Sequence, residues 1–260
     1  MADINFDPNG PGIDNGRYFG LPFTAEESRL VLFPVAWDVT TSYREGTAEG
    51  PTAIQRASLQ VDLYDPHHPQ GWQQGIGTLP SDKSIHENSK KLRKTAQRVI
   101  EHWENNGAPD DDTLQANLAQ INQGSAELNH IVYETSRRWI EAEKKVGIVG
   151  GDHSSPLGAI RAAAERYPGM GLLHIDAHAD LRKAYEGFTY SHASIMYNVL
   201  NELPDVSMLV QVGIRDYCDD ELHLASSTPQ VVQFTDHDLS AEKFGGSSWY
   251  ALCKQIISPL

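Results

Sequence analysis

The 260-residue chain is 40% hydrophobic and 22% charged, a composition typical of a globular protein with a sizeable buried core. Its formal net charge of −14 argues against nucleic acid or an anionic membrane as a partner, because both attract basic surfaces. It contains no apolar run of about 18 residues that would span a membrane. Met1 to Gly20 lacks the basic start and apolar middle of an export signal, so we expect a cytoplasmic protein.

The first part of the chain is expected to contain two strands and a short helix. The apolar run from Arg29 to Val35 predicts the first strand. Gly50-Pro51 predicts the start of a helix, because proline is favoured in a first turn. Gln60 to Asp65 is a second extended candidate, and the stretch that follows it, up to Gly77, is expected to be loop.

Three helices are expected in the middle of the chain. Ser84 to Glu87 has the Ser-x-x-Glu form of a capping box, and the apolar residues behind it recur at helical spacing over residues 85 to 105. A polar break from Asn105 to Asp112 follows. Two further helices are then predicted over residues 113 to 122 and 126 to 144.

From Lys145 the pattern alternates between strands and helices. One strand is expected to begin at Lys145, and another is expected to end at Ile175. Further strands are expected over Met208 to Ile214, over Val231 to Phe234 and from Ile256 onward. The expected helices are Pro156 to Tyr167, with Ser155 as N-cap, and Ile195 to Glu202. Alternating strands and helices imply a mostly parallel sheet covered on both faces. We therefore predict an N-terminal arm over residues 1 to 28 and one α/β domain over residues 29 to 260.

A group of metal-ligand side chains follows the strand that ends at Ile175. Asp176, His178 and Asp180 occupy every second position, which is the spacing of one face of an extended segment. Carboxylates and an imidazole that converge in this way suit a divalent metal ion. The alternative is a solvated loop with surface acids.

A second polar strand end weakens that alternative. Lys145 to Ser155 is a short apolar strand that breaks at glycines and then presents Asp152 and His153. In an open α/β sheet, ligands bind at the carboxyl ends of the strands. With His153 added, four protein ligands are available for two metal ions, and such a pair of ions would make hydroxide available near neutral pH. His192 is the best candidate for moving protons, and its alternative role is as a capping or core histidine.

These two motifs resemble those of a known family. Gly150-Gly151-Asp152-His153-Ser154 followed by Asp176-Ala177-His178-Ala179-Asp180 is similar to the first two metal motifs of the ureohydrolases, the arginase and agmatinase family. Tyr43 to Ala53 and Val210 to Arg215 look like further segments of the same family, so the resemblance covers residues 29 to 215.

The resemblance implies a three-layer α/β/α fold and an oligomer, a trimer or hexamer. It also implies two metal ions, usually manganese, that activate water against a guanidinium carbon and release urea. His153, Asp176 and Asp180 would hold the first ion, and Asp176 and His178 the second. His192 would correspond to the active-site histidine near the substrate, and Asp152 would orient its surroundings.

The chain departs from the family pattern after residue 215. The third metal motif, an Asp-x-Asp pair on a later strand, and a later glutamate that holds the guanidinium group are not found. Asp236 and Asp238 form an Asp-x-Asp pair, but their segment is expected to be a loop. If the chain truly ends at Leu260, we expect weak metal binding, and a non-catalytic homologue becomes the alternative.

The motifs also favour one subgroup of the family. Asn9 to Gly12, Val35 to Tyr43 and Ser191 to Met196 look most like the guanidine hydrolases, for which nickel is the implied metal. The best prediction is therefore hydrolysis of free guanidine, a small cationic substrate, to urea and ammonia. Agmatine and other guanidino compounds are the alternative substrates, with manganese as the metal.

Overall fold

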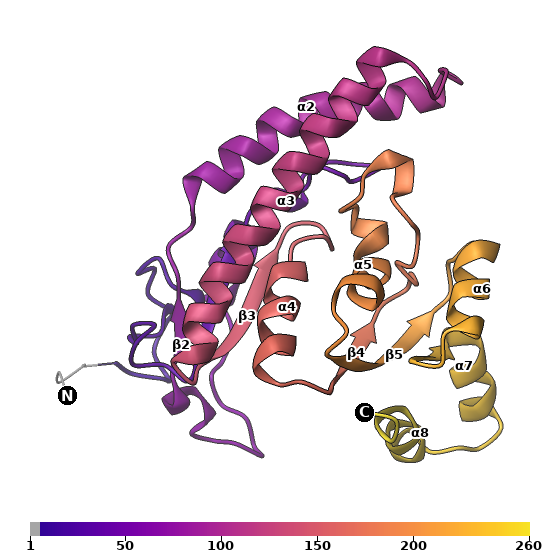
Figure 1. Ribbon diagram of the computed structural model, residues 1–260. Helices are drawn as coiled ribbons and strands as arrows, with labels where there is room; N and C mark the ends of the chain where they lie inside the picture. Colours follow the sequence, from indigo (N-terminus) through magenta and orange to yellow (C-terminus); the bar gives the residue numbers. More distant parts are fainter. Residues whose placement is uncertain (1–5) are drawn as a thin grey trace. The chain divides into compact units, whose positions relative to one another are not determined.

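The computed structural model describes residues 6–260, which form two compact units (Figure 1). The first unit ends at Ala159, and the second extends from Ile160 to Leu260. Each unit has its own three-stranded sheet, and every strand pair in both sheets is parallel. The predicted α/β class is therefore confirmed. The strands form two sheets, whereas one mostly parallel sheet was predicted.

The sheet of the first unit has the strand order β2-β1-β3. Its strands are β1 (Leu30–Val35), β2 (Ile76–Thr78) and β3 (Lys145–Gly150). The central strand β1 pairs with β3 along its whole length, from Leu30 opposite Lys145 to Val35 opposite Gly150. The shared register brings the carboxyl ends of β1 and β3 to the same level.

The helices of the first unit follow from caps and apolar spacing in the sequence. They are α1 (Gly50–Ser58), α2 (Lys83–Glu104) and α3 (Asp112–Glu141), with short 3-10 helices η1 (Tyr18–Gly20), η2 (Thr47–Glu49) and η3 (Gly71–Gln74). Helix α1 has proline in its first turn, as predicted. Helices α2 and α3 lie side by side in Figure 1, and Gly124 of α3 faces Leu92 of α2.

The described part of the N-terminal segment is anchored to the first unit. Tyr18 and Leu21 are fully buried. The Tyr18 hydroxyl donates a hydrogen bond of 3.0 Å to the carbonyl oxygen of Pro51. Residues 1–5 of the predicted arm lie outside the described residues.

The sheet of the second unit has the strand order β4-β5-β6. Its strands are β4 (Met170–Ile175), β5 (Val206–Ile214) and β6 (Val231–Thr235). Its helices are α5 (Ile195–Glu202), α6 (Asp219–Ser227), α7 (Asp236–Phe244) and α8 (Trp249–Ile257), with short 3-10 helices η4 (Tyr185–Gly187) and η5 (His192–Ser194). Helix α4 (Leu157–Arg166) contains the point where the two units divide. Val210, Val212 and Ile256 form a buried core cluster between β5 and α8.

Several predicted elements differ from those observed. Gln60 to Asp65 is not a strand, and β2 forms instead in the stretch expected to be loop. The side chain of Val61 is 54% exposed, so the weak alternation there has no buried face. No strand begins at Ile256, because Ile256 lies in the last turn of helix α8.

The predicted helix boundaries also change. Helix α3 is continuous where two helices were expected, because Gly124 packs against α2 and does not break the helix. Asp82 caps α2 in place of the predicted Ser84, and its carboxylate accepts the Ser84 amide at 2.8 Å. The hydroxyl of Ser155 has no hydrogen-bond partner, so it does not act as the N-cap expected for α4.

Among the described residues 6–260, no helix combines the length and the apolar character that a bilayer crossing requires.

Candidate metal centre

The candidate site of the second unit lies where β4 ends. The Asp176 amide still donates to the Val212 carbonyl of β5, at 3.0 Å. The Ala177 carbonyl then accepts the amides of Arg215 and Asp216, at 2.8 and 3.1 Å. The segment that carries the ligand-type side chains is therefore held against the end of β5 after regular strand pairing stops.

Asp180 adopts a left-handed backbone conformation, with φ of +52°. Its carbonyl accepts the amides of Met196 and Tyr197 in the first turn of α5, at 3.0 and 3.1 Å. The alternating pattern predicted from Asp176 therefore ends before Asp180, and the turn leaves Asp180 only 5% exposed. Non-glycine residues in this conformation are uncommon and are retained where surrounding contacts enforce them.

A buried glutamate fixes the residue that follows. Glu221 of α6 accepts the Leu181 amide with one carboxylate oxygen, at 3.0 Å, and the Cys218 amide with the other, at 2.9 Å. The guanidinium Nε of Arg182 lies 3.5 Å from the same carboxylate. Because Glu221 is only 4% exposed, these contacts tie the turn at Asp180 firmly to the start of α6.

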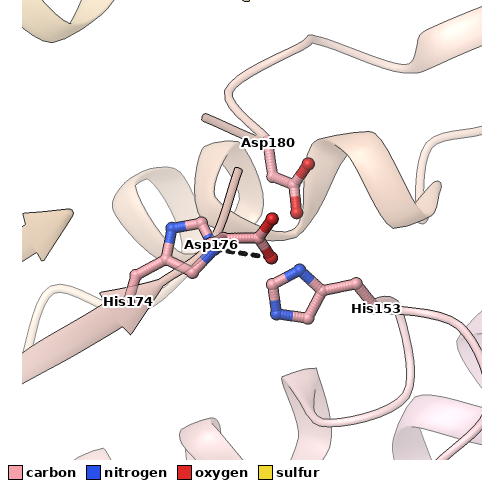
Figure 2. A group of neighbouring side chains, drawn as sticks. All are labelled: His153, His174, Asp176 and Asp180. Carbon is pink, nitrogen blue, oxygen red and sulfur yellow. Dashed lines mark ion pairs between the residues drawn. The ribbon is translucent and has the colours of Figure 1, made fainter. Parts of the chain in front are cut away.

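Three side chains of this unit converge (Figure 2). Ligand-type atoms of His174, Asp176 and Asp180 lie within 4.8 Å of one another. His174 Nε2 is 3.4 Å from Asp176 Oδ2, the pair joined by the dashed line in Figure 2. Asp176 and Asp180 are both among the predicted metal ligands. His174 is 4% exposed and bonded to Gln211.

His178 lies on the other side of Asp176. Its Nδ1 is 3.5 Å from Asp176 Oδ1, and its Nε2 is 3.6 Å from Asp216 Oδ2. The His178 amide also donates to Asp176 Oδ1, at 3.0 Å. The His178 side chain is 59% exposed, so it is far more accessible than Asp180. The Asp176 carboxylate thus has an imidazole near each of its two oxygens.

His192 opens the short helix η5, directly before α5. Its ring packs edge-on against Tyr185, with the ring centroids 6.2 Å apart. The buried Ser191 hydroxyl accepts the Ala193 amide at 3.1 Å and lies 3.5 Å from His192 Nδ1. The Arg182 amide donates to the Ala193 carbonyl at 3.1 Å, so the turn after Asp180 and the segment around His192 are held together through the backbone.

His153 belongs to the first unit, in the turn that follows β3. The preceding Asp152 is 7% exposed, and its Oδ1 accepts the amide and the hydroxyl of Ser154, at 2.9 and 2.5 Å. Gly151 is required here, because a Cβ atom would lie 2.0 Å from the Trp37 carbonyl oxygen. These contacts agree with the prediction that Asp152 orients this turn.

The Asp-x-Asp pair near the C-terminus occupies a helix start instead of the predicted loop. Asp236 and Asp238 lie in the first turn of α7. Asp238 is bonded to Thr235 and lies 3.3 Å from His237 Nδ1. These interactions lower the pKa of the Asp238 carboxyl, with the Thr235 hydrogen bond as the largest cause. Acidic residues in the first turn commonly stabilise a helix, because they interact favourably with its amino-terminal dipole.

The converging side chains of the second unit fit a divalent metal ion. Asp176 and the buried Asp180 place two carboxylates close together, and their mutual repulsion favours a bound cation. Carboxylate oxygen with imidazole nitrogen, which His178 beside Asp176 can supply, is a donor set that suits first-row divalent ions. The second unit can therefore supply ligands to such an ion from its own residues.

Sequence reasoning missed two buried residues that shape this site, Gln211 and Glu221. Gln211 interrupts the apolar run of β5, and a polar residue in a buried strand is a signal that its side chain has a specific partner. Glu221 lies within a predominantly acidic segment, where nothing in the sequence distinguishes a buried carboxylate from an exposed one.

Comparison with known proteins supports the resemblance. Residues 28–247 match the model of the arginase family. An N(1)-aminopropylagmatine ureohydrolase of Thermus thermophilus is 32% identical over 218 residues, which are 84% of this chain and 61% of that protein. The agmatinase of Bacillus cereus is 25% identical over 201 residues, which are 77% of this chain and 57% of that protein.

Solved structures share the fold at lower identity. The proclavaminate amidino hydrolase from Streptomyces clavuligerus superposes with a TM-score of 0.62 at 20% identity, over 93% of this chain and 70% of that chain. The arginase from Bacillus cereus gives a TM-score of 0.61 at 19% identity, over 89% and 70%. The chain spans about three fifths of the length of the curated relatives described above. The family match extends over most of the chain, and the chain belongs to the arginase family.

Proposed function

We propose that this protein hydrolyses a guanidinium compound and releases urea, with two divalent metal ions as cofactors. The observation that carries the proposal is the convergence of Asp176 and Asp180 at the end of β4, in a chain of the arginase family. The acidic pair also suits a cationic substrate, because the charges of the pair and of a guanidinium group are opposite.

The proposed ligands are Asp176, His178, Asp180 and His153. Asp176 is proposed for the shared position from its motif, and its carboxylate has two oxygens that can each face one ion. Asp180 is held by its backbone contacts to α5 and by the anchoring of Leu181 to Glu221. His153 is proposed from its motif, Gly150 to Ser154.

The reaction adds water across the guanidinium carbon and breaks one C–N bond, so that urea and an amine or ammonia leave. When bound, the ions would supply hydroxide near neutral pH by lowering the pKa of water. His192 is proposed to give a proton to the departing nitrogen, because a histidine can exchange protons near neutral pH. Its position before α5, whose first turn binds the Asp180 carbonyl, supports this role.

Two substrate classes are proposed. The sequence motifs favour free guanidine, with nickel as the metal. The names of the relatives favour an alkylguanidine such as agmatine or aminopropylagmatine, and the resemblance then implies manganese. The resemblance also leads us to propose a homo-oligomer.

Urea release tests the proposal directly. The purified protein is incubated with guanidine, agmatine, aminopropylagmatine, arginine or guanidinobutyrate, each with added manganese or nickel. We expect urea from at least one pairing, and we expect Asp176→Asn to abolish it. Urea release from guanidine alone, and only with nickel, supports guanidine as the substrate. Urea release from an alkylguanidine with manganese supports the alternative substrate class.

A non-catalytic homologue that binds metal without hydrolysing a guanidinium compound is the alternative candidate. Metal binding measured by calorimetry separates the two candidates. Bound metal with no urea from any pairing would favour the non-catalytic homologue over hydrolysis.

A further inference from the structure

A ladder of polar side chains crosses the sheet of the second unit at a single level. His174 of β4 is in register with Gln211 of β5, and Gln211 is in register with Gln233 of β6. Gln233 Nε2 donates to Gln211 Oε1 at 2.8 Å, and Gln211 Nε2 lies 2.9 Å from His174 Nδ1. His174 and Gln211 are 4% and 0% exposed, so this polar ladder lies in a sheet interior that is otherwise largely apolar.

The ladder fixes the orientation of the Gln211 amide. Gln211 Nε2 donates a second hydrogen bond of 2.6 Å to the Ala179 carbonyl, and a carbonyl oxygen can only accept. The amide nitrogen of Gln211 therefore faces both Ala179 and His174. The Ala179 carbonyl determines this orientation, because the opposite amide orientation would place two accepting oxygen atoms against each other.

The orientation of Gln211 in turn sets the tautomer of His174. Because Gln211 donates to Nδ1, that nitrogen is an acceptor and the proton of the neutral imidazole resides on Nε2. Nε2 faces Asp176 Oδ2 at 3.4 Å. The Nε2–H group of the imidazole thus lies beside one oxygen of the carboxylate, in an ion-pair contact that does not meet hydrogen-bond geometry, while the His178 amide donates to the other oxygen.

Gln211 also holds the backbone next to the second carboxylate, that of Asp180. Its bond to the Ala179 carbonyl holds the peptide directly before Asp180. One buried amide therefore sets the His174 ring beside Asp176 and holds the backbone directly before Asp180.

We propose that His174 and Gln211 are positioning residues that orient Asp176 and Asp180 for metal binding, and that His174 does not itself bind metal. The inference rests on the proposed function, in which Asp176 and Asp180 are ligands. Partners of this kind around metal ligands typically alter metal affinity about 10- to 100-fold when they are removed.

Gln211→Met tests the role of the ladder, because methionine has a similar length and no amide. We expect its affinity for Mn²⁺, measured by calorimetry, to fall about 10- to 100-fold with the number of bound ions unchanged. Gln233→Met removes only the outer rung and is expected to have a smaller effect in the same direction. Ile256→Val, in the core of the same unit, is the control for lost stability and is expected to leave the affinity unchanged.

His174→Gln separates positioning from ligation. A positioning residue predicts weaker binding with the same number of ions, and electron paramagnetic resonance of bound Mn²⁺ should show no loss of a nitrogen ligand. Loss of one ion or of a nitrogen ligand would make His174 a ligand and overturn the proposal. Unchanged affinity in Gln211→Met, with stability lowered as in the Ile256→Val control, would reduce the ladder to a structural role and also overturn it.

The metal-free protein provides a test that is independent of metal binding. In ¹⁵N-correlated nuclear magnetic resonance spectra, His174 is expected as the neutral Nε2–H tautomer in the wild type, and Gln211→Met should remove this preference. An Nδ1–H tautomer in the wild type would contradict the ladder. If the wild type binds no metal, the proposed function fails. The ¹⁵N resonances of the His174 ring still show, in that case, whether the ladder sets the tautomer of His174.

Discussion

At the scale of single residues, Asp180 combines burial, charge and an uncommon backbone conformation. The buried carboxylate of Asp180 lies close to that of Asp176. This raises the free energy of the metal-free folded protein, because two like charges repel more strongly where water is largely excluded. A bound cation removes this repulsion. The folded protein should therefore be stabilised by divalent metal more strongly than a protein with scattered surface acids.

Asp180→Asn is expected to abolish this response to metal. At a free Mn²⁺ concentration of 100 times Kd, a ligand specific for the folded state stabilises it by about 2.7 kcal/mol. The wild-type melting temperature should rise accordingly, and that of Asp180→Asn should not. Asp236→Asn, at the exposed start of α7, is the matched control and should respond like the wild type. A response lost in Asp236→Asn but kept in Asp180→Asn would move the site to the Asp-x-Asp pair.

Tyr18 predicts a pH dependence of stability in the first unit. Burial raises the pKa of the Tyr18 phenol from 10.0 to about 12. Between these pH values the unfolded chain loses the proton that the folded protein keeps, so the free energy of unfolding falls as pH rises. The contribution of Tyr18 is fully present below pH 10.0 and is lost by about pH 12.

Tyr18→Phe should therefore flatten the decline in stability over this pH range. It should also lower stability by about 1 kcal/mol at neutral pH, because the hydrogen bond to Pro51 is lost. Denaturant unfolding at several pH values measures both effects. An equally steep alkaline decline in the variant would show that another group is responsible.

At the scale of elements, the turn that carries Asp180 depends on its attachment to α6. Glu221→Gln replaces one accepting oxygen with an amide NH₂, which cannot accept from a backbone N–H group. Since Glu221 accepts both the Leu181 and Cys218 amides, one buried donor would be left unsatisfied, at a cost of about 1 to 3 kcal/mol. Denaturant unfolding should reveal this loss, whereas Asp220→Asn in the same turn should cost little. Equal stabilities for the two variants would contradict the anchoring role.

The contact between α2 and α3 depends on the absence of a side chain at Gly124. A Cβ atom there would lie 2.3 Å from Leu92 Cδ1, so Gly124→Ala should destabilise the protein despite the better helix propensity of alanine. The effect should reverse in a Leu92→Ala background, where the clash is absent and alanine gains up to about 1 kcal/mol over glycine. A double-mutant cycle from thermal unfolding checks this reversal. Additive changes would mean that the two helices do not pack through this pair.

The sequence predicted most elements wherever local signals and burial agree. Strands β1, β3, β4, β5 and β6 follow apolar runs, and α2 and α5 follow helical spacing. Strand β2 was missed because three residues, Ile76 to Thr78, carry no periodic pattern, and only pairing with β1 makes them a strand. Helix α3 was predicted as two helices, over residues 113 to 122 and 126 to 144, since the packing that keeps it continuous cannot be recognised without the partner helix.

The candidate site was predicted in part for similar reasons. Asp176 and Asp180 were identified from the local spacing, and the structure brings them together. The polar ladder through Gln211 was not found, because it depends on which strands are neighbours and on their register. The left-handed turn at Asp180 also depends on distant contacts with α5 and α6.

At the scale of the whole molecule, the chain joins two parallel α/β units that each have their own sheet, and residues 28–247 match one family. The net charge of −14 favours a cationic substrate over an anionic one. We propose that two metal ions share the carboxylate of Asp176.

Anomalous X-ray diffraction from crystals grown with MnCl₂, recorded at the manganese edge, tests this claim most directly. We expect two anomalous peaks about 3.5 to 4 Å apart with the Asp176 carboxylate between them, and with Asp180, His178 and His153 as protein ligands. A map with no peak at Asp176, or with manganese bound only elsewhere on the protein, would contradict it.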